Sequence, residues 1–78
     1  MPTVLRTGPY QVYFYSHEPR ERPHVHIDRD NHSAKFWLDP VTLARNHGFS
    51  ARELGRIRSI VKRHATELQE AWHEFFGR

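Results

Sequence analysis

Two histidines that stand one residue apart, His24 and His26, are the residues of this sequence best suited to do chemistry. They alternate with two β-branched residues, Val25 and Ile27. Successive side chains of a β-strand point to opposite faces, so the imidazoles share one face and the aliphatic side chains share the other. On a strand the imidazoles would lie ~6.5–7 Å apart. The pattern predicts a strand with one face in the core and a chemical site on the other.

Acid–base cleavage of RNA is one use of such a pair. One histidine can take a proton from a 2′-hydroxyl group while another group protonates the leaving oxygen and cations hold the phosphate. This chemistry requires no cofactor. It makes His24 and His26 candidate catalytic residues of a metal-independent ribonuclease.

A metal site is the alternative use of the same pair. Zinc or another divalent metal held by His24 and His26 would need at least one further ligand. Four side chains of suitable chemistry stand nearby in the sequence, namely His17, Glu18, Asp28 and His32. Strand histidines also serve as hydrogen-bonded structural residues, so the sequence leaves these interpretations open.

Composition and charge limit the class of protein. The chain of 78 residues is long enough for a single domain, residues 1–78, with one two-layer core. It has no cysteine, which is typical of a reducing, cytoplasmic setting, and no apolar run approaches the ~20 residues of a membrane span. Ten of its twelve basic residues are arginine, and the net charge is +3. Arginine binds phosphate and carboxylate bidentately, so an arginine-rich surface fits RNA, DNA or an acidic protein partner; ordinary solubilising charge is the alternative.

Period-two patterns predict strands within residues 3–45. A first strand is expected at 3–7, followed by the turn Gly8-Pro9, and an aromatic strand at 10–16. The strand with the two histidines follows, and then residues 34–38, which alternate apolar and polar side chains. Residues 41–44 fit a last short strand or an extended link.

A helix is predicted at about residues 50–76. Ser50 with Glu53 fits a capping box, and apolar residues recur at three- and four-residue spacing from there to Phe76. One long helix is the simplest interpretation, although Thr66 and Gln69 form a second capping pattern that would permit a break near His64. The expected fold is α+β, an antiparallel meander of three or four strands with the long C-terminal helix packed on one face.

One helix cannot cover both faces of that sheet. The uncovered face would carry Tyr13, Tyr15, His24, His26, Lys35 and Trp37. Aromatic rings can stack on bases, at ~1–3 kcal/mol for each stacked ring, while Lys35, Arg22 and Arg29 bind phosphates. Exposed aromatic residues also mark protein interfaces.

Arginines form a second candidate surface on the predicted helix. Arg52, Arg56 and Arg63 share one stripe that continues as Glu67, Glu70 and Glu74. Cations are disfavoured near a helix N-terminus and anions near a C-terminus, so this order opposes the dipole of a single helix. We expect these arginines to contact phosphate or an acidic partner; a solvated face is the alternative.

The sequence also resembles a known family. Pro23-His24-Val25-His26-Ile27, the segment 34–40, Gly48-Phe49-Ser50 and Ala71-Trp72-His73 are similar to the bacterial domain of unknown function 4160 family, whose members are built around a His-Val-His motif. The resemblance implies no assigned activity. It does imply an operon with another small protein, an arrangement similar to toxin–antitoxin pairs.

These observations lead to two hypotheses besides the metal site. The first is a cytoplasmic toxin–antitoxin-type module that binds or cleaves RNA on the open sheet face, with a small protein partner covering that face when inactive. The second is a non-catalytic interaction module, antitoxin-like or regulatory, whose aromatic residues bind a partner chain or a second copy.

Overall fold

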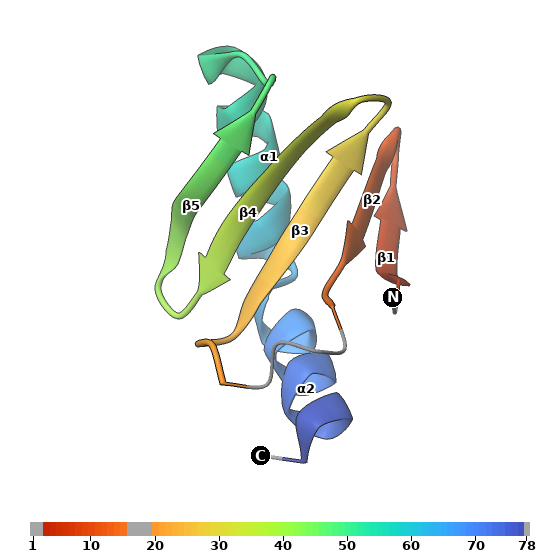
Figure 1. Ribbon diagram of the computed structural model, residues 1–78, viewed down its shortest axis with the longest axis vertical. Helices are drawn as coiled ribbons and strands as arrows, with labels where there is room; N and C mark the ends of the chain where they lie inside the picture. The colour runs from red at the N-terminus through yellow and green to blue at the C-terminus, as the bar shows by residue number, and fades with distance from the viewer. Residues whose placement is uncertain (1–2, 16–19, 78) are drawn as a thin grey trace.

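The computed structural model describes residues 3–15 and 20–77 of the chain. Its elements are β1 (Thr3–Thr7), β2 (Tyr10–Tyr13), β3 (His24–Arg29), β4 (His32–Leu38), β5 (Val41–His47), α1 (Ala51–Arg63) and α2 (Ala65–Phe76). The strands form one antiparallel sheet in the order β1-β2-β3-β4-β5, so each strand pairs with its neighbour in sequence (Figure 1). The α+β class and the meander are therefore confirmed, but the sheet has five strands rather than three or four.

The fifth strand is a full edge strand and not a short link. In β5, Leu43 pairs with Phe36 of β4 and Val41 pairs with Leu38, and both aliphatic side chains pack against the core. A register shift follows Leu43, and beyond it Arg45 and the residues up to His47 are exposed. The second half of β5 does not meet the core, which explains why the sequence predicted a strand or link only at residues 41–44.

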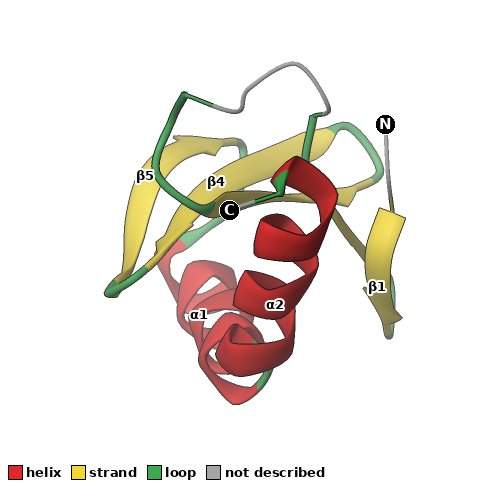
Figure 2. Cartoon of the chain, turned by 90° about the horizontal axis from the view of Figure 1, so that it is seen from below, coloured by secondary structure: helices red, strands yellow, loops and turns green. Residues whose placement is uncertain are grey.

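The C-terminal region forms two helices rather than one. His64 ends α1 and precedes α2 with φ −105° and ψ 11°, so the expected single helix is wrong. The break falls in the region where it was considered, but Thr66 lies inside α2 and does not cap it. The backbone N–H of His64 donates to Ile60, and the carbonyl of His64 accepts from Leu68. Both helices lie on the same face of the sheet (Figure 2).

The break lets two helical segments of different direction reach one twisted sheet. α1 contacts β4 and β5, whereas α2 contacts β3 and β4. Ile57 and Val61 of α1 and Leu68 and Trp72 of α2 are buried. None of the helices in the described part of the chain is long and apolar enough to cross a membrane.

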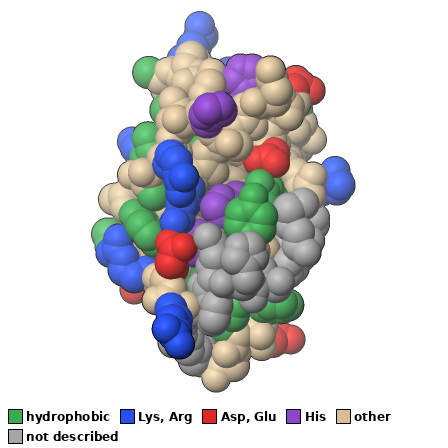
Figure 3. Space-filling model, viewed as in Figure 1, with side chains coloured by type: hydrophobic (Ala, Val, Ile, Leu, Met, Phe, Trp, Pro, Cys, Tyr) green, Lys and Arg blue, Asp and Glu red, His purple; other side chains and the backbone are tan. Residues whose placement is uncertain are grey.

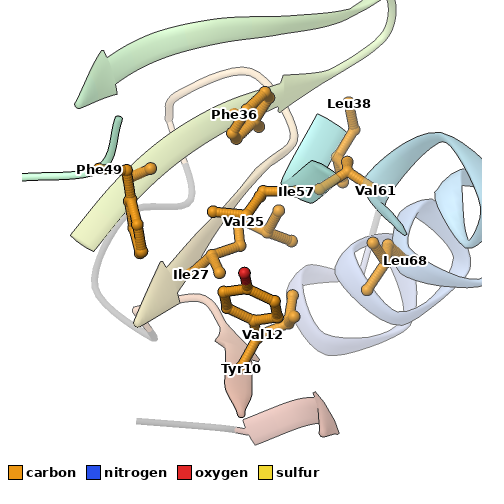
Figure 4. Close-up of a cluster of buried hydrophobic side chains, with 11 residues drawn as sticks. Tyr10, Val12, Val25, Ile27, Phe36, Leu38, Phe49, Ile57, Val61 and Leu68 are labelled. Atoms are coloured by element: carbon orange, nitrogen blue, oxygen red, sulfur yellow. The ribbon is translucent and has the colours of Figure 1, made fainter. Parts of the chain in front are cut away.

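The core lies between the sheet and the two helices (Figure 4). Val25 and Ile27 are buried there, as the alternation with the histidines predicts. Burying one aliphatic side chain of this size stabilises a fold by ~1.5–3 kcal/mol. The cluster consists of Tyr10, Val12, Val25, Ile27, Ala34, Phe36, Leu38, Phe49, Ile57, Val61 and Leu68.

The start of α1 is tied to the sheet by an ion pair. The hydroxyl of Ser50 accepts from the backbone N–H of Glu53, which confirms the predicted N-cap. The carboxylate of Glu53 does not complete a capping box; it accepts from Arg29 Nε at 2.6 Å and from the Tyr10 hydroxyl at 2.7 Å. These hydrogen bonds, with that from Arg29 first, hold the pKa of Glu53 below its ordinary value.

Candidate functional site

A cavity of about 350 Å³ opens on the sheet face that the helices leave uncovered. It is lined by Tyr13, Tyr15, His26, Ser33, Ala34, Lys35, Arg45 and His47; we call this the sheet pocket. In the space-filling view of this face, basic and histidine side chains lie beside one another (Figure 3). No carboxylate is among the described residues that line it, although two lining residues contact one: Lys35 donates to Glu21 and Tyr13 donates to Asp28.

Strand register brings these side chains together. His26 of β3 pairs with Lys35 of β4, and Lys35 pairs with Arg45 of β5. In the neighbouring row Ser33 pairs with His47. Residues at alternate positions share a face, so Arg45 and His47 join His26 on one surface although they come from the far edge of the sheet.

Arg45 and His47 are site residues that reasoning from the sequence missed. Both side chains are exposed on β5. The alternation Val41, Leu43, Arg45 and His47 would have placed all four side chains on one face, the core face. The register shift after Leu43 places Arg45 and His47 on the open face while Leu43 packs on the core, which simple alternation would not predict.

Aromatic contacts hold His26 in place. The Tyr13 ring stacks on the imidazole with 5.4 Å between ring centroids, and the Tyr15 ring lies tilted at 4.6 Å. The Tyr13 hydroxyl in turn donates to the carboxylate of Asp28 at 3.0 Å. Burial is the largest cause that raises the pKa of Tyr13 above its ordinary value, followed by its hydrogen bonds to Tyr15 and Asp28. Tyr13 is therefore a protonated donor at neutral pH that positions His26.

His24 lies on the expected side of β3 but is not accessible. It is fully buried, and the centroid of its ring lies 4.8 Å from that of Trp72 and 5.7 Å from that of Trp37. Its Nδ1 lies 2.8 Å from the carbonyl oxygen of Arg22, so this nitrogen donates the hydrogen bond. Trp72 of α2 covers the end of the sheet, and the expectation that both imidazoles face an open surface is wrong for His24.

Three other expected contact residues form a cluster beside His24. The Arg22 guanidinium lies 4.3 Å from the centroid of the Trp37 ring, and the Lys35 ammonium lies 4.6 Å from the same ring. Lys35 also donates to Glu21 and is only 7% exposed. Two cations thus cover Trp37, which makes its ring a poor platform for a base.

The remaining expected arginines lie elsewhere on the molecule. Arg29 is held by Glu53 and Asp30. Arg52 and Arg56 line a second hollow at the start of α1, and Arg63 is exposed at the end of that helix. None of these residues lines the sheet pocket.

The metal hypothesis gains little from the geometry. Within residues 3–15 and 20–77, no three His, Asp or Glu side chains are grouped so that they could hold a metal ion. Nδ1 of His24 is bound to a carbonyl, and His32 packs beside Phe49 with its ring centroid 5.5 Å away. His17 and Glu18, two of the suggested ligands, lie outside the described residues.

The fold and the site together define a small α+β domain with a five-stranded meander and a pocket of rings and cations on its open face. The chain belongs to the family described as a domain of unknown function (DUF4160), whose model matches residues 10–73. This match includes every residue that lines the sheet pocket. No curated protein and no solved structure matches the chain.

Proposed function

We propose that this protein binds single-stranded RNA in the sheet pocket. The observation that carries the proposal is the lining of the pocket, where the half-buried rings of Tyr15 and His26, with the buried Tyr13 behind them, adjoin the basic side chains of Arg45 and His47. Rings bind bases by stacking, and cations bind phosphates, so this combination suits a nucleotide better than a simple anion. Stacking requires an unpaired base, which favours a single strand.

Each part of a nucleotide has a counterpart in the pocket. Arg45 is exposed and can donate two parallel hydrogen bonds to one phosphate. Tyr15 is half-buried beside His26 and presents a ring to a base, at about 1–3 kcal/mol for a stacked pair. A volume of about 350 Å³ is in the range of small-ligand sites. A longer strand would continue across the sheet.

The toxin–antitoxin setting implied by the family resemblance belongs to the same proposal. In it, a small protein partner would cover the sheet pocket and compete with RNA. The positive net charge of +3 suits an acidic partner as well as RNA. Competition between the two ligands is thus expected at one surface.

The direct test is RNA binding by a double variant, Arg45→Gln with His47→Gln. Fluorescence anisotropy with a labelled octanucleotide of single-stranded RNA measures the dissociation constant over a series of salt concentrations. We expect the constant to rise roughly tenfold or more, because a hydrogen bond to a charged group contributes about 1.5–3 kcal/mol. The slope of the logarithm of the binding constant against the logarithm of the salt concentration should decrease in magnitude by about 0.7 for each lost phosphate contact.

The matched control is Arg56→Gln with His73→Gln, which removes the same two residue types from exposed helix positions. This control should bind RNA within about twofold of the unmodified protein, because surface charges away from the site act mainly through screened fields. An equal loss of RNA affinity in both double variants would mean that binding depends only on the net charge of the protein. Loss in the control alone would move the site to the arginines of α1.

An interaction module is the second candidate, favoured by the end of α2. Phe75 is 49% exposed, and its ring lies 5.3 Å from that of Phe14 and 5.1 Å from that of Phe76. Phe14 is buried and Phe76 is half-buried, so Phe75 is the exposed edge of this aromatic cluster. Such a ring can contact another chain, and a second copy would bury it symmetrically. Size exclusion over a hundredfold range of concentration tests this; a dimer that Phe75→Gln dissociates supports it, and a monomer throughout removes it.

A further inference from the structure

We propose that the sheet pocket also cleaves the RNA that it binds, with His26 and His47 as the acid–base pair and Arg45 as the phosphate contact. This inference rests on the proposed RNA binding and adds an activity to it. The substrate class is single-stranded RNA, and the products are a 2′,3′-cyclic phosphate and a 5′-hydroxyl end. The pair differs from the His24 and His26 pair of the sequence motif, because only one of those imidazoles reaches the pocket.

The first argument is the placement of the two imidazoles. His26 is on β3 and His47 is on β5, two strands away, and both line the same cavity. The two histidines are offset by two residues along the strands. Lys35 of β4 pairs with both His26 and Arg45, whereas Ser33, two residues earlier on β4, pairs with His47. Ordinary strand spacings place their Cα atoms roughly 12 Å apart. Two imidazoles that lean into the space between them can therefore reach opposite sides of one phosphate.

The second argument is the position of the cation. Arg45 stands two residues before His47 on the same strand and face, in the row of His26. A guanidinium there can bind the non-bridging oxygens of a phosphate that lies between the two imidazoles. Negative charge grows on those oxygens in the transition state, and a charge already in position stabilises it without reorganisation.

The third argument is the difference in surroundings between the two imidazoles. His26 is stacked on Tyr13 and contacts Tyr15. The centroid of its ring lies 5.1 Å from that of the buried His24. These contacts fix its orientation, which general acid–base catalysis requires. His47 is exposed on the edge strand, where it can follow the leaving or attacking oxygen. His24 and Tyr13 are thus positioning residues rather than catalytic ones.

The reaction balances with the pocket and the RNA alone. A neutral imidazole accepts the proton of the 2′-hydroxyl group, and the 2′-oxygen forms a bond to phosphorus. The bond from phosphorus to the 5′-oxygen breaks, and the protonated imidazole gives its proton to that oxygen. The two histidines exchange protonation states, no water is consumed, and nothing is oxidised or reduced. Since one imidazole must be neutral and the other protonated, the rate should follow a bell-shaped pH profile.

The experiment uses the full chain, labelled single-stranded RNA and a chelator that removes divalent metals. Denaturing gels follow cleavage, and mass spectrometry identifies the new ends. We expect cyclic phosphate ends, no cleavage of the same RNA with 2′-deoxy sugars, and a loss of roughly 100-fold or more in rate for His26→Gln and for His47→Gln. His73→Gln, purified in parallel, should keep the full rate. A contaminating nuclease would cleave equally in every preparation, so a loss confined to the two pocket variants excludes it.

The outcomes separate this inference from the RNA binding beneath it. If the unmodified protein binds RNA in the sheet pocket but leaves the RNA intact, the proposed cleavage is wrong and the proposed RNA binding stands. Protein that neither binds nor cleaves overturns both. Cleavage that survives both His26→Gln and His47→Gln also overturns the assignment. His47→Gln changes an exposed edge residue, and circular dichroism checks that it folds.

Discussion

His24 and His26 stand one residue apart and have opposite surroundings. The ring of His24 is enclosed by Trp37 and Trp72, whereas His26 borders the sheet pocket. The alternation of the strand could be predicted from the sequence, and both imidazoles do lie on the side away from Val25. What covers His24 could not be predicted, because Trp72 comes from a helix whose direction depends on the break at His64.

We predict that His24 contributes to stability and not to RNA contact. His24→Ala should lower the free energy of unfolding by about 2–4 kcal/mol, as other large-to-small changes in packed cores do. His24→Asn should cost less, because its amide nitrogen can still donate to the Arg22 carbonyl. Urea denaturation measures both values. If His24→Ala were as stable as the unmodified protein but lost RNA affinity, His24 would be a contact residue.

We also predict an acid-sensitive ion pair at Glu53. Its pKa is lowered from 4.5 by the hydrogen bond from Arg29 and then by that from Tyr10. A carboxylate with a lowered folded-state pKa stabilises the fold fully above its ordinary pKa, and this contribution is lost as the pH falls through the lowered value. Glu53→Gln should therefore be less stable than the unmodified protein at pH 7.

The stability difference between Glu53→Gln and the unmodified protein should shrink once the pH falls below about 4.5. Thermal unfolding between pH 7 and pH 3 measures it. Arg58→Gln, an exposed change on the same helix, is the control and should show no such convergence. A difference that stays constant down to pH 3 would contradict the ion pair.

At the scale of elements, the break at His64 changes the meaning of the helix charges. In one long helix, arginine before glutamate opposes the dipole. In the two helices observed, Arg63 lies in the last turn of α1 and Glu67 in the first turn of α2, so both are favourably placed. Arg52, in the first turn of α1, and Glu74, in the last turn of α2, still oppose the dipoles of their helices. The helix dipole therefore gives no reason to expect a ligand at Arg63, and its role as a contact residue stays a prediction.

This reversal predicts opposite effects for two similar substitutions. Arg63→Gln should lower the free energy of unfolding by about 0.3–1 kcal/mol, and Arg52→Gln should raise it by a similar amount. Both residues are exposed, and glutamine has nearly the helix propensity of arginine. Urea denaturation at low salt measures the two changes. Equal effects of the same sign would show that the helix dipoles do not govern these positions.

At the scale of the whole molecule, the two sheet faces follow from one alternating pattern. The patterns around Val25, Ile27, Phe36 and Leu38 sufficed to predict the core face and hence the open face. The pocket itself could not be predicted, since it needs the fifth strand and its register shift to bring Arg45 and His47 beside His26. Long-range register is set by turns and packing that a local pattern does not contain.

The central claim is that RNA lies on the open face of the sheet. Titration of ¹⁵N-labelled protein with a single-stranded octanucleotide, followed by amide chemical shifts, tests it most directly. We expect the largest shifts at Tyr13, His26, Ser33, Arg45 and His47, with little change along α1. Shifts that gather at the start of α1, around Arg52 and Arg56, with the sheet unchanged, would contradict the account.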